Sequence, residues 1–200
     1  ATITGGTLNL VPENSFAGLR NEGILTIGGA DVQLNQCAWS NGTLTVQDNA
    51  KIDVTHADGT DMYAWDIVPG SRFDFVSGTI TAENAAFMIG GEMNIGADAV
   101  LQLTDSDFHA DGAITLNGGS VTMVQEALMD NLFLGTVTDE YGTWDNYQYQ
   151  SRLYVSGLLN LNSGELSLTN VAMNVDGSAV VNQNGAAVTV TNQAVPAQER

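Results

Sequence analysis

Acidic residues form two short runs whose spacing could hold a metal ion. Asp58 and Asp61 lie in the first run, and Asp105 and Asp107 lie in the second. Calcium prefers oxygen ligands, so these four aspartates are candidate calcium ligands. Neither run has the spacing of the twelve-residue calcium loop, and solvated acidic corners of the chain are the alternative interpretation.

The tetrapeptide His-Ala-Asp-Gly occurs twice, as residues 56–59, which overlap the first acidic run, and as residues 109–112, which follow the second. A histidine near a carboxylate can bind a transition metal or transfer protons. Asp-Gly also makes tight corners, with the histidine on the surface just before the turn. The spacing of the two copies is close to a whole number of short repeat units, so both could lie on one flank.

An aromatic segment near residue 145 is the best candidate for recognising a ligand. It contains Tyr141, Trp144, Tyr147 and Tyr149, interleaved with amide and carboxylate side chains. Aromatic faces stack on sugar rings and anchor protein contacts, so these four residues are candidate ligand-binding residues. The alternative is an excursion that packs its aromatic side chains on its own chain.

The net charge of the chain limits the classes of molecule that it is expected to bind. The 200 residues contain 23 Asp and Glu but 5 Lys and Arg, which gives a net charge of −18. Nucleic acids and anionic membranes attract basic surfaces, so the sequence predicts neither as a partner. Divalent cations, basic partners and neutral glycans remain compatible. The Asn-, Thr- and Gly-rich composition favours an extracellular or cell-surface location, and no apolar run is long enough to span a membrane.

A short repeat organises the chain. Residues 42–54 read as glycine, an alternating strand, a polar turn, and a second alternating strand that begins with alanine. Residues 23–34 and 91–103 follow the same pattern, and 19 residues separate Gly23 from Gly42. That spacing is typical of one coil of a solenoid with three short strands, whose apolar residues point inward and whose polar residues point outward.

The repeat predicts an all-β parallel β-helix that forms one domain over residues 1–200. Residues 124–152 interrupt the repeat and are expected to form a projecting insertion, with a short helix over Gln125–Leu134. Asn117-Gly118 can make either a hairpin turn or a corner between strands. An antiparallel β-sandwich is the main structural alternative.

The stretches Gly42–Val54 and Gly91–Leu103 resemble the repeats in passenger domains of bacterial autotransporters and related β-helical adhesins. The resemblance implies a right-handed parallel β-helix on or outside a bacterial cell. It also implies either a fragment of such a passenger or a subunit of a fibre or surface layer. No functional residue is carried over, because the repeat describes structure and not a site.

The sequence therefore predicts a non-enzymatic, extracellular structural or adhesive module. Its expected partners are further copies of itself, a surface protein or a glycan. The alternative is a glycan-binding or glycan-cleaving β-helix that uses the aromatic insertion and the acidic flank. A polysaccharide lyase would also need a basic residue, and neither acidic run contains Lys or Arg.

Overall fold

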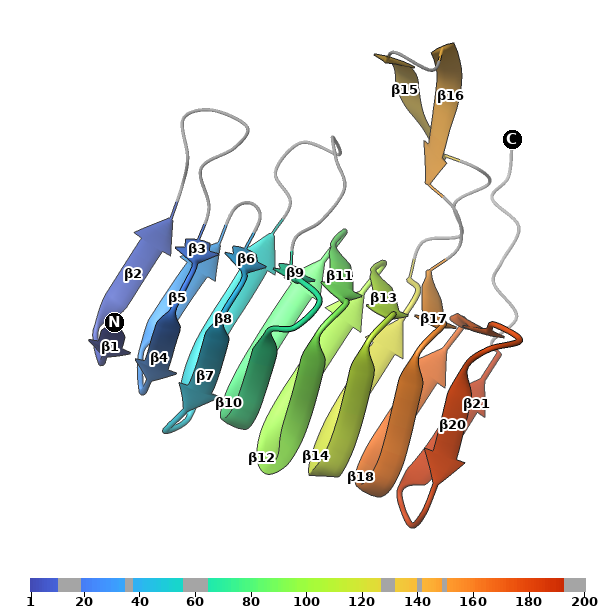
Figure 1. Ribbon diagram of the computed structural model, residues 1–200. Coiled ribbons are helices and arrows are strands. Elements are labelled where there is room, and N and C mark those ends of the chain that lie inside the picture. Colours follow the sequence, from blue (N-terminus) through green and yellow to red (C-terminus); the bar gives the residue numbers. More distant parts are fainter. Residues whose placement is uncertain are drawn as a thin grey trace.

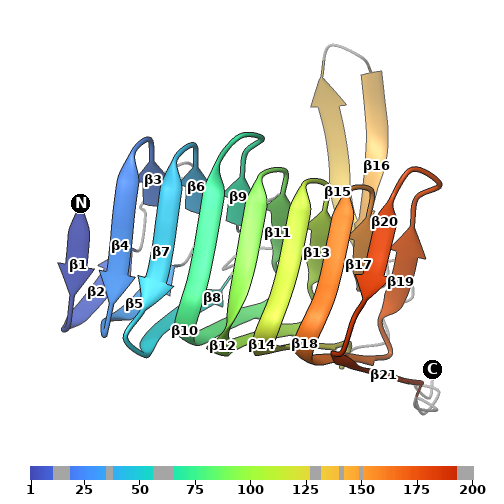
Figure 2. The same ribbon diagram turned by 60° about the horizontal axis from the view of Figure 1, so that its bottom comes forward.

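The computed structural model describes residues 1–10, 19–34, 38–55, 65–126, 132–139, 142–148 and 151–192. These residues form a parallel β-solenoid of about seven coils, and no helix occurs among them (Figure 1, Figure 2). The predicted all-β parallel solenoid is therefore confirmed, and its right-handed sense stays a prediction. Within the same residues, no helix is long and apolar enough to cross a membrane.

Each coil contributes to three faces, and strands of successive coils pair in parallel. The first face contains β1 (Thr2–Thr4), β4 (Ile24–Gly28), β7 (Thr43–Gln47), β20 (Val180–Gln183), and the first halves of β10 (Arg72–Glu83), β12 (Glu92–Thr104), β14 (Ala113–Val124) and β18 (Leu158–Thr169). The second face contains β2 (Thr7–Leu10), β5 (Asp31–Leu34), β8 (Ala50–Thr55), β21 (Ala187–Thr191), and the second halves of the same four long strands.

The third face is a separate seven-stranded sheet. It contains β3 (Leu19–Asn21), β6 (Ala38–Ser40), β9 (Trp65–Ile67), β11 (Ala86–Ile89), β13 (Asp107–Ala110), β17 (Arg152–Val155) and β19 (Ala172–Val175). Asn117-Gly118 lies within β14, where the register with β18 shifts, and therefore makes a corner and not a hairpin.

The core is built from side-chain columns that run along the solenoid axis. Alternation along each strand points every second residue inward, and parallel pairing places these residues above one another. Leu25, Leu44 and Phe73 form one such column, and each is at most 5% exposed. Trp65 stacks with Phe73 and Phe87, with ring centroids 5.4 and 5.7 Å apart, so aromatic rings fill the middle coils.

Close approach of the preceding coil requires glycine at the tight corners between the third and first faces, although Gly23 of the first coil has no atom within 4 Å of its Cβ position. The glycines of this column directly precede the first-face strands and are Gly23, Gly42, Gly91, Gly112 and Gly157. A Cβ on Gly112 would lie 2.0 Å from the carbonyl oxygen of Gly91, closer than any real contact. Ser71 and Ala179 occupy the same column, but their corners are wider turns closed by hydrogen bonds to Val68 and Asp176.

The corner between the first and second faces also excludes side chains larger than a methyl group. Ala50, Gly78 and Ala99 pair in register there, and Ala50 and Ala99 are at most 1% exposed. A Cβ on Gly78 would lie 2.2 Å from the carbonyl oxygen of Ala50. The alanine and glycine of the sequence repeat are therefore the two corner residues of a coil.

The corner between the second and third faces has two forms. In its short form one residue adopts a positive φ, as in Asn84 (52°), Asp105 (47°) and Asn170 (58°). Asn and Asp tolerate this left-handed conformation better than other non-glycine residues. Its long forms contain residues 11–18, 35–37, 56–64 and 125–151, so nearly all variation in coil length arises at this corner.

Coil lengths agree with the predicted repeat in the regular part of the chain. Contacts between equivalent side chains of adjacent coils join residues 19 apart at Asn21 and Ser40, and 20 apart at Asp74 and Asn94. The coil that carries the insertion is longer, because Thr115 and Asn160 are 45 residues apart. The register resumes after the insertion, so the insertion leaves the core columns continuous.

The predicted insertion is confirmed as a β-hairpin. β15 (Leu132–Asp139) and β16 (Gly142–Gln148) pair antiparallel with each other only and project from the solenoid (Figure 1, Figure 2). The predicted helix over Gln125–Leu134 is wrong for residues 132–134, which lie in β15. There the pairing with β16 outweighs local helix propensity. Residues 127–131 lie outside the described residues.

We expect Gly112→Ala to lower the free energy of unfolding by about 2 kcal/mol or more, because its Cβ overlaps backbone atoms of the preceding coil. Gly177→Ala is the matched control, since Gly177 also lies between the third and first faces but has no atom within 4 Å of its Cβ position. Urea unfolding of both variants measures the difference. Equal stability of the two variants would contradict the proposed close approach.

Candidate functional site

Two of the four candidate aromatic residues lie in the described strands of the hairpin. Trp144 and Tyr147 lie in β16, where their backbones pair with Val137 and Phe133 of β15. Tyr141 and Tyr149 lie outside the described residues. The hairpin is inserted between β14 and β17, so its base adjoins the third face.

A charged cluster lies on the third face next to the base of the hairpin. Asp107 of β13 pairs with Arg152 of β17, with Nε and Oδ2 3.3 Å apart, and its Oδ1 accepts a 3.0 Å hydrogen bond from the Arg152 backbone N–H. His109 Nε2 lies 3.7 Å from Asp107 Oδ2. The nearest cation to the second acidic run therefore comes from 45 residues further along the chain.

Tyr154 connects this cluster to the next coil. Its ring lies 5.5 Å from that of His109, and its hydroxyl donates a 3.2 Å hydrogen bond to Asp176 Oδ2. The hydrogen bond to Asp176, together with the charge of that carboxylate, raises the pKa of the Tyr154 phenol. Ser156 Oγ similarly donates to Asp111 Oδ1 at 2.6 Å. These contacts join coils to one another, so the cluster is a structural network across the third face.

Asp66 is a partly buried carboxylate of the third face. It pairs in register with Trp39 on one side and Met88 on the other, and burial raises the pKa of its carboxyl group. The central carbon of the Arg20 guanidinium also lies over the Trp39 ring, 4.8 Å from the ring centroid. Trp39 therefore packs on the flank of the solenoid, whereas Trp65, the next residue of this type, is fully buried.

The structure gives the second acidic run a structural role. Asp105 is the left-handed corner residue before β13, and its Oδ1 accepts a 2.9 Å hydrogen bond from the Glu126 backbone N–H. Asp107 is held by Arg152. Asp58 and Asp61 lie outside the described residues. Among the residues that the structure describes, no group of three or more His, Cys, Asp or Glu could hold a metal ion, and the calcium site stays a prediction.

The second His-Ala-Asp-Gly copy begins in a strand of the third face, and the first copy lies outside the described residues. Thr55, directly before the first copy, ends a strand of the second face, whereas His109 lies within β13 of the third face. His56 itself lies outside the described residues. The expectation that both copies share one flank therefore gains no support from the strand order.

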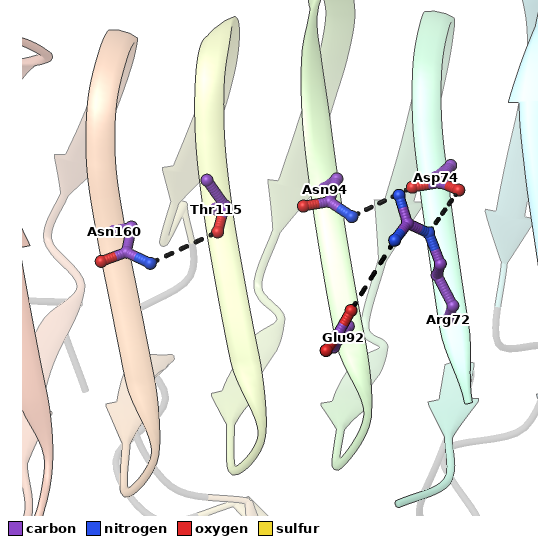
Figure 3. Close-up of polar contacts among 6 residues, drawn as sticks. All are labelled: Arg72, Asp74, Glu92, Asn94, Thr115 and Asn160. Carbon is purple, nitrogen blue, oxygen red and sulfur yellow. Dashed lines mark hydrogen bonds and ion pairs between the residues drawn. The ribbon is translucent and has the colours of Figure 1, made fainter. Parts of the chain in front are cut away.

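The first face carries an outward-facing row of polar side chains, some of which bond from one coil to the next (Figure 3). Asn94 Nδ2 donates to Asp74 Oδ1 at 3.0 Å, and Asn160 Nδ2 donates to Thr115 Oγ1 at 3.4 Å. Asn182 continues the row as an amide column, with a 2.9 Å bond to Asn160 Oδ1. Each of these bonds joins equivalent residues of adjacent coils.

A second amide column runs beside the first at the last coils. Asn162 donates to Asn117 Oδ1, and Asn184 donates to Asn162 Oδ1, each at 2.9 Å. Sequence alternation indicates that such residues face solvent, but it does not reveal that their amides bond from coil to coil. These bonds can be recognised in the sequence only when residues 22 and 45 positions apart are aligned with each other.

A cluster of three charged residues, in which Arg72 pairs with Asp74 and Glu92, interrupts the otherwise neutral first face. Arg72 Nε donates to Asp74 Oδ2 at 2.7 Å, and its Nη1 lies 3.8 Å from Glu92 Oε2 (Figure 3). Partial burial opposes ionisation of Asp74, but the hydrogen bonds from Arg72 and Asn94 and the charge of Arg72 outweigh it. The pKa of Asp74 is therefore lowered. The same hydrogen bond raises the pKa of Arg72.

No family model, no curated protein and no solved structure matches this chain. The likeness to autotransporter and adhesin repeats therefore remains one of sequence pattern.

We expect Asp74→Asn to lower stability at pH 7 by about 1 kcal/mol or less, the range of surface ion pairs. Because folding lowers the pKa of Asp74, its contribution is present above the ordinary value of 3.8 and is lost as the pH falls through the lower folded value. The stability difference between the two proteins should therefore shrink below about pH 4. Thermal unfolding from pH 2 to 7 measures it, with Asp98→Asn as the control. A difference that persists at pH 2 would contradict this assignment.

Proposed function

We propose that this chain is an extracellular structural or adhesive β-solenoid module that assembles end to end with further copies. The proposal rests on the apolar side chains and the sheet edge that the last described coil exposes. Val181, Val188 and Val190 continue inward columns of the core, yet they are 39%, 37% and 57% exposed. Strands β20 and β21 pair only with β18 in the described part of the chain, so apolar side chains and a sheet edge are presented together.

The first coil offers the complementary surface. Leu8 and Leu10 begin the same inward columns that end at Val188 and Val190, and they are only partly buried. A second copy placed with β2 beside β21 would therefore continue both columns in register. Such a head-to-tail contact uses different surfaces on its two sides and does not close on itself, which favours a filament.

Side-chain columns would give such a filament a stiff and uniform surface. Asn182 and Asn184 are the last members of the two amide columns, and each has an amide oxygen that no described residue occupies. Because each copy carries a charge of −18, repulsion between copies opposes assembly and should be weaker in salt.

The projecting hairpin supports the adhesive part of the proposal. It stands away from the core and carries Trp144 and Tyr147, residue types that anchor many interfaces. A surface protein or a glycan is the partner we infer for it.

We expect the double variant Val188→Lys, Val190→Lys to remain monomeric at concentrations where the unmodified chain forms filaments, because two charges would lie within the apolar contact. Val76→Lys is the control, since Val76 is 48% exposed but lies at a mid-solenoid corner. Light scattering and electron microscopy in 0.15 M salt, with calcium or with chelator, measure assembly and its dependence on calcium. A dispersed unmodified chain in both buffers would refute end-to-end assembly.

We expect Trp144→Ala, Tyr147→Ala to abolish retention on the surface glycans or proteins that the module recognises, while filament formation is unchanged. Binding to a glycan array and to immobilised cell-surface extract measures retention. Thr143→Ala, Asn146→Ala is the matched control from the same strand. Equal loss in both variants would indicate that the hairpin fold, and not its aromatic side chains, determines binding.

A further inference from the structure

An open groove of about 470 Å³ crosses the second face where it turns toward the third face. Its volume is within the range of about 300–1,000 Å³ that is usual for ligand sites. Four successive coils line it through β5, β8, β10 and β12. The lining residues are Gln33, Asp53, Val54, Thr81, Ala82, Glu83, Gln102 and Thr104.

The groove is built from one outward row of the sheet. Gln33, Asp53, Thr81 and Gln102 pair in register from coil to coil. The short side chains of Asp53 and Thr81 form the middle of the row, and the long amides of Gln33 and Gln102 form its ends. Glu83 and Thr104 make a second, parallel row closer to the corner. Polar groups therefore recur along the groove at intervals of about 4.8 Å, the distance between coils.

Most of these polar groups have no partner within the protein. In the described part of the chain, the side chains of Gln33, Glu83 and Gln102 make no hydrogen bond or ion pair, whereas Thr81 donates to Asp53 Oδ1. This contrasts with the amide columns of the first face, where neighbouring coils bond one another. The groove therefore offers donors and acceptors that remain available to a ligand.

The chemistry of the lining selects a neutral, hydroxyl-rich ligand. Amides and hydroxyls both donate and accept, as sugar hydroxyls do, and carboxylates accept from them. Neither Lys nor Arg lines the groove, and Asp53, Glu83 and the net charge of −18 repel anionic chains. Val54 and Ala82 are at most 5% exposed and point into the core, so no apolar platform faces the ligand.

The position of the groove also indicates a binding edge. It borders the corner from which the long connections leave, and insertions in repeat proteins gather on the face that binds. We propose that this groove binds an uncharged linear glycan lying along the solenoid axis. Its regular spacing suits several consecutive sugars and not a single one. This site is separate from the hairpin and does not depend on end-to-end assembly.

Calorimetric titration of the 200-residue protein with neutral hexasaccharides (β-1,4-glucan, β-1,3-glucan and β-1,4-mannan) tests the proposal. At least one should bind, and Gln33→Ala, Gln102→Ala should raise its Kd at least tenfold. Thr122→Ala, Ser167→Ala is the matched control, because these residues continue the same outward row beyond the groove. The control variant should bind as the unmodified protein does. Unchanged melting temperatures establish that both variants fold.

Several results would overturn the proposal. No binding of any neutral hexasaccharide at millimolar concentration would do so, as would an equal loss of affinity in the control variant. Binding of polylysine in place of the sugars would assign the groove to a basic partner. Affinity that is lost in Trp144→Ala, Tyr147→Ala but kept in Gln33→Ala, Gln102→Ala would move the glycan site to the hairpin.

Discussion

Close approach of backbone between successive coils is the constraint on which the rest of this structure depends. Parallel strands of adjacent coils are about 4.8 Å apart, and the chain must turn three times without leaving that spacing. At two of the turns a carbonyl oxygen of the preceding coil occupies the space of a side chain, as at Gly112 and Gly78. Where the chain adopts a wider turn, as before Ser71 and Ala179, the requirement disappears. Corner geometry therefore decides which residues the repeat accepts.

Neutral hydrogen bonds between coils take the place that ion pairs occupy on many protein surfaces. Several Asn side chains on the first face bond the equivalent residue of the preceding coil, as Asn160 bonds Thr115 and Asn182 bonds Asn160. Like residues can stack in this way because an amide both donates and accepts, whereas stacked carboxylates would repel one another. The three arginines of the described chain, Arg20, Arg72 and Arg152, each contact a carboxylate. A low content of charged residues is thus the expected composition for a surface made of stacked columns.

The sequence was sufficient to predict the solenoid, because its clearest repeat follows from the close approach of backbone at the corners. The glycine and the alanine of the repeat are the corner residues, and the alternating residues between them are the core columns. The predicted short helix over Gln125–Leu134 was wrong at residues 132–134, because there pairing with β16 outweighed local preference. The contact of Asp107 with Arg152 could not be predicted, since it depends on the length of the inserted segment and on the register that resumes after it. Asp105 illustrates the same limit: an acidic run suggests a metal, but a left-handed corner also selects aspartate.

Most of the variation in coil length in this solenoid arises at one edge, the corner between the second and third faces. The other two corners vary by only one or two residues, as in the wider turns before Ser71 and Ala179 and the register shifts between β10 and β12. Connections at the corner between the second and third faces range from the two residues after β10 to the segment of residues 125–151 that contains the hairpin. Register is preserved across all of them. The connections at this edge can therefore change in length and sequence while the core columns stay in register, because the residues of the columns lie outside these connections.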